Sequence, residues 1–275
     1  MEFGAWEIPG AAIFVFVIIH LFAGQPMYVS PRALSLFLSI LFTVGSSALP
    51  LPRSTDTEPV PPPAIVIGFV GGYIRHDNRV HGGVQIADRL RKDYPSGVYI
   101  EVFENHRGKQ AHQKVLELLG AGHGGSLLDE QKKNARIIIY GHSWGGSETI
   151  ALARALQKDG VPVLLTIQVD SVSKGGGNQA LIPANVQKAA NFYQLNGLLH
   201  GVREIHASDP SRTQIIGNFQ FDYHAHPVRC NGYPWFARLL EKPHIEIECD
   251  PDVQSRVETL IRSNLPPPIK QASTK

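Results

Sequence analysis

The chain has 275 residues, of which 43% are hydrophobic and 18% charged, a composition that predicts one globular domain with a sizeable core plus some additional sequence. Its formal net charge is only +2, and no basic cluster with interleaved aromatic residues occurs, so we expect no nucleic-acid partner. The two cysteines, Cys230 and Cys249, fit no zinc-binding spacing and are too few for a disulfide scaffold. They form one bridge if the protein is exported, or remain two buried thiols.

The first 48 residues form a hydrophobic N-terminal region unlike the rest of the chain. One apolar run covers residues 11–23 with an interruption at His20, and thirteen helical residues reach only about 20 Å, short of the roughly 30 Å core of a membrane. A second apolar run, at 33–44, follows a short positive start at 27–32 and leads into small residues at 46–48. This order is typical of a secretory signal peptide.

Met27 is therefore a candidate for the true initiator, which would make residues 1–26 upstream sequence. The alternatives are that both apolar runs form a short hairpin anchor or an uncleaved structural segment. We expect the protein to be exported, either secreted or periplasmic, or anchored to a membrane through its N-terminus, with membrane contact only through this region. Residues 49–63 are proline-rich and polar, which predicts an extended linker.

Strand and helix patterns alternate through the first half of the globular domain, which we expect to span residues 64–265. The strand patterns are short, β-branched and apolar throughout, whereas the helix patterns carry apolar residues at helical spacing among charged ones. In chain order they predict a strand at 64–70 that runs directly into Gly71 and Gly72, a helix at 80–94, a strand at 97–103 and a helix at 110–119.

The central stretch is an apolar strand at 137–140 that runs into the sequence Gly-His-Ser-Trp-Gly-Gly and then into a helix that ends at 158–160. Ser143 therefore lies on a strand-to-helix turn. Gly141 and Gly145, two residues before and two after the serine, allow the strand and helix to approach closely and hold the serine in a strained conformation. The other interpretation of Ser143 is an ordinary helix N-cap, which does not explain glycines on both sides.

The second half of the domain continues the alternation, which requires crossover connections and so predicts a parallel, doubly wound sheet. Its predicted elements are a strand at 161–170, a loop at 171–185, an amphipathic helix at 186–195, a strand at 213–219 and a closing helix at 253–261. Residues 266–275 are expected to form a disordered tail.

The Gly-x-Ser-x-Gly turn between a strand and a helix resembles the nucleophile elbow of the α/β-hydrolase superfamily, and the resemblance covers roughly residues 64–261. It implies an α/β fold with a doubly wound, mainly parallel sheet and a small or absent lid. It also implies an oxyanion hole formed by the backbone amides of Val70 and Trp144, although the choice among Val70, Gly71 and Gly72 stays open. No cofactor or metal is required for this chemistry.

The resemblance implies a catalytic triad in the order serine, acid, histidine. Asp170 ends the strand after the elbow helix, at the edge of the sheet where ligands collect, and some branches of the superfamily carry the acid there. We expect the acid to be Asp170, with Asp222 and then Asp209 as rivals.

The candidates for the base are His200, His206, His224, His226 and His244. His244 is expected in a loop immediately before the terminal helix, where the superfamily places its base. The pair His224 and His226 has the spacing to share a metal, but no further ligand stands at a recognisable distance, so we expect a surface loop.

These residues predict a serine hydrolase that cleaves carboxylic esters or thioesters, in the manner of a lipase or esterase. Its partner would be a small-molecule or lipid acyl ester. Acyl transfer on the same triad is one alternative. A non-catalytic binding protein that retains the fold is another.

Overall fold

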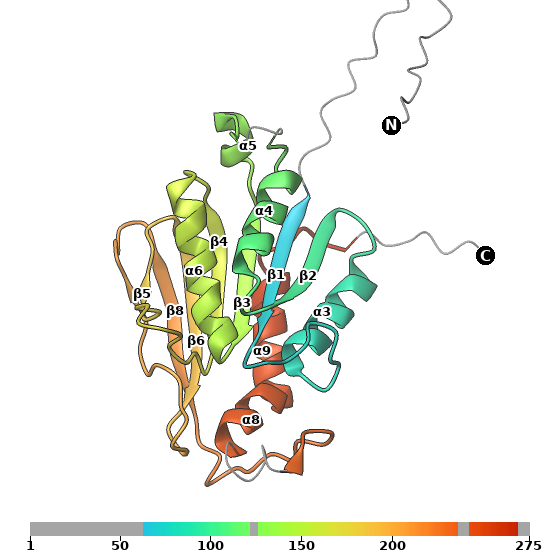
Figure 1. The fold of residues 1–275 in the computed structure, drawn as a ribbon, viewed down its shortest axis with the longest axis vertical. Coiled ribbons are helices and arrows are strands. Elements are labelled where there is room, and N and C mark those ends of the chain that lie inside the picture. The colour runs from blue at the N-terminus through green and yellow to red at the C-terminus, as the bar shows by residue number, and fades with distance from the viewer. Residues whose placement is uncertain (1–62, 122–125, 236–241, 269–275) are drawn as a thin grey trace, which may run out of the picture. The chain divides into compact units, whose positions relative to one another are not determined.

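The computed structural model describes residues 63–121, 126–235 and 242–268 (Figure 1). The predictions for the N-terminal region, for the linker up to residue 62 and for the tail from residue 269 lie outside these residues. All described residues belong to one compact unit, Pro59–Lys275. Within the described ranges, no helix combines the length and the apolar character needed to cross a membrane.

Six strands form one sheet in which every neighbouring pair is parallel. In the sheet their order is β2-β1-β3-β4-β6-β8, so the chain turns back after β2 and places β3 on the other side of β1. The carboxyl ends of β1 and β3 therefore border the crevice where ligands bind in open α/β sheets. The strands are β1 (Ala64–Val70), β2 (Val98–Glu104), β3 (Ile137–His142), β4 (Val163–Val169), β6 (Val186–Gln194) and β8 (Gln214–Phe221).

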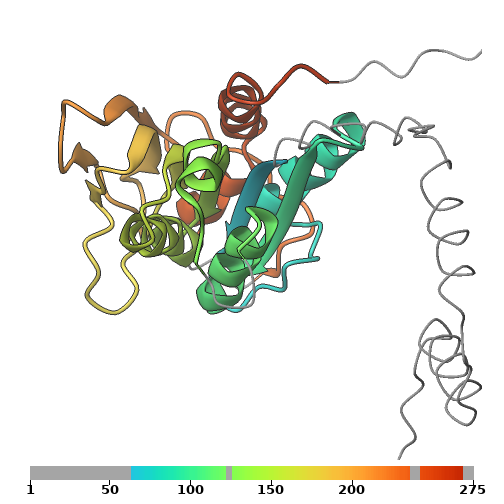
Figure 2. The same cartoon turned by 90° about the horizontal axis from the view of Figure 1, so that it is seen from above.

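Helices cover both faces of the sheet. Figure 2 shows α4 and α6 on one side and α9 on the other, where α3 packs against it. Along β1, Ile65 and Ile67 pack toward α4 and α6 while Val66 packs toward α3 and α9, which explains the continuous apolar run in this strand. The helices are α3 (Gly82–Asp93), α4 (Gly108–Leu118), α5 (Asp129–Lys133), α6 (Trp144–Lys158), α8 (Lys242–Cys249) and α9 (Pro251–Arg262).

The predicted fold class is confirmed: the sheet is parallel and doubly wound, in the α/β-hydrolase arrangement. Between α6 and α8 the described residues include the strands β4, β6 and β8 and the short parallel pair β5 (Leu181–Ile182) and β7 (His206–Ala207).

The helix predicted at 186–195 is wrong, because this segment is the strand β6. It pairs with β4 on one side and with β8 on the other, and both of its faces are buried. Ala189 belongs to the core on the α6 side and Phe192 to the core on the α9 side. Apolar residues on both faces of a central strand therefore produced a spacing that resembles a helical period.

Candidate active site

Ser143 occupies the turn between β3 and α6 with φ 57° and ψ −125°. A side chain in this region costs on the order of 1–3 kcal/mol, so neighbouring contacts must hold the conformation. The Ser143 amide donates to the Val169 carbonyl (3.0 Å), and the Ser143 carbonyl accepts from the amides of Gly146 (3.0 Å) and Val172 (3.1 Å). The hydroxyl makes no capping hydrogen bond to α6, so a helix-capping role does not account for this serine.

Close backbone approach explains the glycines around the serine. A Cβ on Gly141 would lie 2.3 Å from the Gly145 carbonyl oxygen, and a Cβ on Gly145 would lie 2.3 Å from the Phe69 carbonyl oxygen. A Cβ on Gly71, directly after β1, would lie 2.8 Å from the Cβ of Ser143. The strained turn is therefore possible only because these three positions lack side chains.

Asp170 directly follows β4, and its side chain is fully buried. Its Oδ1 accepts from the amides of Gly201 (2.7 Å) and Gln194 (3.3 Å), and its Oδ2 accepts from the side-chain amide of Gln194 (2.8 Å). These donors replace water around the carboxylate and fix its orientation.

His244 lies with its Nδ1 2.7 Å from Oδ2 of Asp170, and its side chain is almost completely buried. When Nδ1 carries the ring proton and donates a hydrogen bond to the carboxylate, the lone pair of the neutral ring is on Nε2. The predicted location in a loop is wrong, because His244 is the third residue of α8. This helix precedes α9 and is separated from it by Asp250.

A cavity of about 480 Å³ brings Ser143 and His244 together, since both line its wall. Among the described residues no hydrogen bond joins the Ser143 hydroxyl to His244. Catalytic hydrogen bonds of this kind are commonly long in a free enzyme and shorten when substrate binds. The structure thus brings all three predicted triad residues to the carboxyl edge of the sheet, with the acid and base in direct contact.

The loop after β1 forms another part of the cavity wall. Gly71, Gly72 and Tyr73 line the cavity, whereas Val70 is buried in the core and does not. The Asn105 side-chain amide donates to the Gly72 carbonyl, which holds the loop against the end of β2. Trp144 also lines the cavity and, as the first residue of α6, has an amide without a partner inside the helix.

The rival acids and histidines lie elsewhere. Asp222 is exposed and its Oδ1 caps a turn by accepting from the amides of His224 and Ala225, and Asp209 caps the turn at Ser211 in the same way. None of the other candidate histidines lines the cavity: His200, His206, His224 and His226. Within the described ranges, no three His, Cys, Asp or Glu side chains are grouped to hold a metal ion.

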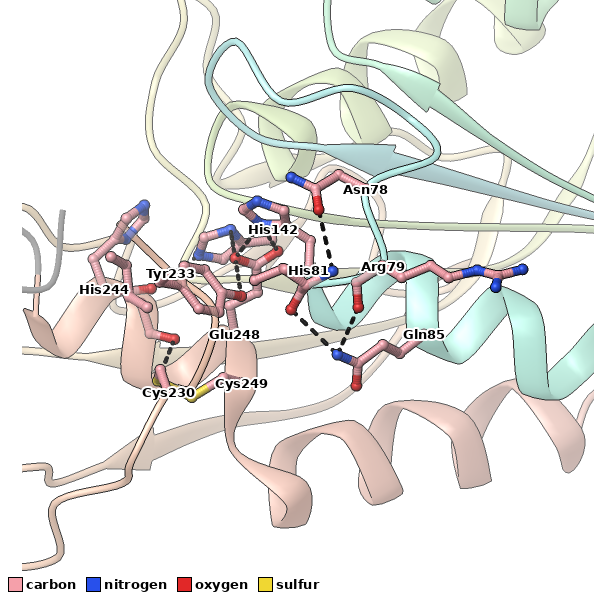
Figure 3. A network of polar contacts seen from close by, with 12 residues as sticks. Asn78, Arg79, His81, Gln85, His142, Cys230, Tyr233, His244, Glu248 and Cys249 are labelled. Atoms are coloured by element: carbon pink, nitrogen blue, oxygen red, sulfur yellow. Dashed lines mark hydrogen bonds and ion pairs between the residues drawn. A yellow bond between two sulfur atoms is a disulfide. The ribbon is translucent and has the colours of Figure 1, made fainter. Parts of the chain in front are cut away.

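Sequence reasoning missed a polar wall of the same cavity, made by His81, His142, Tyr233 and Glu248. Figure 3 shows these side chains gathered around the Glu248 carboxylate. His142 places its ring 4.5 Å from that of His244 and donates from Nε2 to the His244 carbonyl (3.0 Å).

Burial lowers the pKa of His142 to about 4, with partial opposition from the nearby Glu248 charge. Because the pKa in the unfolded chain is about 6.5, the unfolded state binds more protons between these values, and stability falls as the pH drops through this window. We expect the free energy of unfolding to be about 2 kcal/mol smaller at pH 5 than at pH 8 because of His142 alone. Urea unfolding at the two pH values measures this loss.

The matched variant for this measurement is His142→Gln, which keeps a donor toward the His244 carbonyl but does not titrate. The free energy of unfolding of this variant should therefore fall less between pH 8 and pH 5 than that of the wild type. Glu248, whose folded pKa lies below its ordinary value, contributes only below about pH 4.5 and therefore outside the measured range. Equal losses in wild type and variant would contradict the prediction.

Cys230 and Cys249 form a disulfide with a Cα–Cα distance of 5.8 Å, which decides between the two possibilities left open by the sequence. The bond joins the segment that carries Tyr233 to the end of α8, next to Glu248. The loop that it closes also carries His244.

The fold and site together have the features of an α/β-hydrolase-like protein: a parallel sheet of this order and a serine at the turn between β3 and α6. The sequence matches no family model, and no curated protein matches it. A comparison with solved structures returns matches that include three proteins at 10–14% identity.

The first is a cutinase-like protein from Cryptococcus sp., at 12% identity and a TM-score of 0.38, covering 74% of this chain and 95% of its own. The second is a lidless α/β serine hydrolase from Xanthomonas campestris, at 14% identity and a TM-score of 0.38, covering 76% and 87%. The third is an esterase/lipase from an uncultured bacterium, at 10% identity and a TM-score of 0.37, covering 94% and 99%.

Proposed function

We propose that this protein is a serine hydrolase that cleaves carboxylic ester or thioester bonds. One observation carries the proposal: a serine in a strained strand-to-helix turn shares a cavity with a histidine whose Nδ1 is hydrogen-bonded to a buried carboxylate. A purely structural role for Ser143 would not explain why its hydroxyl makes no capping hydrogen bond and why the residue lines the same cavity as an oriented imidazole.

In the proposed reaction the Ser143 hydroxyl attacks the substrate carbonyl carbon, and Nε2 of His244 accepts the hydroxyl proton. The same nitrogen then donates that proton to the leaving alcohol or thiol, which leaves an acyl-enzyme on Ser143. Water attacks the acyl-enzyme by the reverse sequence of proton transfers and releases the acid. Asp170 keeps the His244 tautomer fixed and stabilises the imidazolium that forms in each step.

The oxyanion that develops during each attack needs backbone donors at the carboxyl edge of β1 and β3. We propose that the Trp144 amide supplies one donor and that the loop after β1 supplies the other. Because Gly71, Gly72 and Tyr73 line the cavity and Val70 does not, the loop donor is best placed among these three residues. A single donor of this kind contributes about 3 kcal/mol in comparable enzymes.

The cavity supports an acyl ester as substrate. Alongside the reacting groups its wall includes the apolar or aromatic side chains of Tyr73, Trp144, Val172 and Leu199, against which an acyl chain or a hydrophobic alcohol would pack. Small-molecule and lipid esters both fit this description.

A fluorophosphonate probe, which phosphonylates activated serines, tests the proposal directly. The wild-type protein should be labelled at Ser143 and should hydrolyse p-nitrophenyl esters in a panel of increasing acyl length. Absence of both labelling and turnover would contradict the proposal and favour a binding protein with this fold. Formation of new esters in the presence of added alcohols would identify acyl transfer instead of hydrolysis.

We also propose that the protein is exported, on the basis of the signal-like order of residues 27–48. The Cys230–Cys249 disulfide supports export, since such bonds persist in oxidising compartments.

A further inference from the structure

The cavity contains a second histidine–carboxylate pair that the proposed mechanism does not use. His81 Nδ1 lies 3.1 and 3.0 Å from the two oxygens of the Glu248 carboxylate, and both residues line the same cavity as Ser143 (Figure 3). His81 is 8% exposed and Glu248 is 5% exposed. His81 is also the N-cap residue of α3, but its side chain makes no capping hydrogen bond. The helix therefore does not explain why this position carries an imidazole.

Contacts around Glu248 fix its charge and the orientation of His81. The Tyr233 hydroxyl donates to Oε2 of Glu248 (2.9 Å), and Nδ1 of His142 lies 3.5 Å from the same oxygen. Burial alone would raise the pKa of Glu248, but the interactions with His142, His81 and Tyr233 outweigh it and lower the pKa to about 2. Glu248 is consequently an anion near neutral pH, and its carboxylate accepts a hydrogen bond from the Nδ1–H group of His81.

With its proton on Nδ1, a neutral His81 ring has an acceptor lone pair on Nε2. No described residue forms a hydrogen bond with this nitrogen. The Tyr233 ring packs edge-on against the imidazole, with ring centroids 5.0 Å apart, and restricts its rotation. An imidazole that is held in one orientation, is more than nine-tenths buried and lines a cavity is suited to a hydrogen bond with a ligand, and in the neutral ring Nε2 accepts that bond.

We propose that His81, held by Glu248 and Tyr233, forms a subsite for a hydroxyl group carried by the ester substrate. A hydroxyl can donate to Nε2, whereas the negative charge of Glu248 directly behind the ring disfavours carboxylate and phosphate groups. The subsite lies close to the reacting groups, because His142 touches both Glu248 and His244. This inference rests on the proposed function and deepens it, since it selects hydroxylated esters within the class.

Two matched pairs of esters test the subsite, each differing only by exchange of a terminal methyl for a hydroxyl. On the alcohol side the pair is propyl butanoate and the butanoate monoester of ethylene glycol. On the acyl side the pair is p-nitrophenyl butanoate and the p-nitrophenyl ester of hydroxypropanoic acid whose hydroxyl group is at the end of the chain. The wild type should prefer the hydroxylated member of at least one pair by roughly tenfold in kcat/KM.

His81→Phe keeps an aromatic ring but removes both nitrogens, and it should reduce the preference ratio to about one. A purely structural defect would lower kcat/KM for both members of a pair and leave the ratio unchanged, which would overturn the inference. His206→Phe, at an exposed histidine outside the cavity, is the matched control and should keep the wild-type ratio. A wild type that shows no preference in either pair would overturn the inference without any variant.

Binding to Ser143→Ala separates this inference from the proposed chemistry. Calorimetry with the same four esters should show tighter binding of the hydroxylated member in the preferred pair, even if no ester is turned over. Turnover of both members at equal rates by the wild type would refute the subsite and leave the hydrolase intact. Selective binding by Ser143→Ala without any turnover by the wild type would refute the hydrolase and leave the subsite intact.

Discussion

Ser143→Ala should lower kcat for p-nitrophenyl ester hydrolysis by roughly 10⁶-fold, because the attacking oxygen is absent and water must replace it without an acyl-enzyme. Alanine has the same Cβ as serine and no further side-chain atom, and the serine hydroxyl makes no capping bond, so the fold should not change. The measurement is kcat together with labelling by the fluorophosphonate probe, which should also disappear.

Ser147→Ala provides the matched control for this prediction. Ser147 is buried on the same helix but does not line the cavity, so its removal should leave kcat near the wild-type value. Circular dichroism and thermal unfolding check that both variants are folded. If Ser143→Ala retained most of the wild-type kcat while folded, the nucleophile would have to be another residue.

If Asp170 is the triad acid, Asp170→Asn should lower kcat by about 10⁴-fold, the scale of this change in a known serine triad. The asparagine can still accept from the Gly201 amide, so the local backbone is preserved. However, an amide NH₂ placed opposite Nδ1 of His244 favours the tautomer with its proton on Nε2, and this tautomer cannot accept the Ser143 proton. Steady-state kinetics with the preferred p-nitrophenyl ester measures the loss.

The control here is Asp222→Asn, which changes the strongest rival of Asp170. Asp222 is exposed, and its side chain accepts from backbone amides of its own turn and from Asn196. Its replacement should alter kcat by less than about threefold, as for an ordinary surface change. A large loss in Asp222→Asn combined with a small one in Asp170→Asn would reverse the assignment of the acid.

The sequence was sufficient to predict those parts of the fold in which local pattern and tertiary role agree. The apolar run of β1 and the strand, glycine turn and helix around Ser143 each carry a local signature, and the structure contains them at the predicted places. In β6 the two disagree. Its apolar residues serve two cores, and its pairing with β4 and β8 overrides the helix-like spacing.

Helix α8 could not be predicted from its local sequence pattern either. Isoleucine and glutamate alternate from Ile245 to Glu248, so the segment has no helical period, yet all of these residues are buried within a helix. Pro243, near the start of α8, is the local feature that could have indicated a helix. The pairing of His81 with Glu248 had no local signature, because 167 positions separate the two residues and only the fold brings them together.

The covalent loop between Cys230 and Cys249 contains His244, Tyr233 and Glu248, so a single bond encloses the proposed base and the two residues that hold His81 in place. Closing a loop of this length removes freedom from the unfolded chain worth about 3 kcal/mol in the entropic description. A chain synthesised where thiols stay reduced would have to assemble this part of its cavity without that constraint. If the protein is the exported hydrolase proposed above, oxidation of this cysteine pair would stabilise the part of the cavity that carries the proposed base.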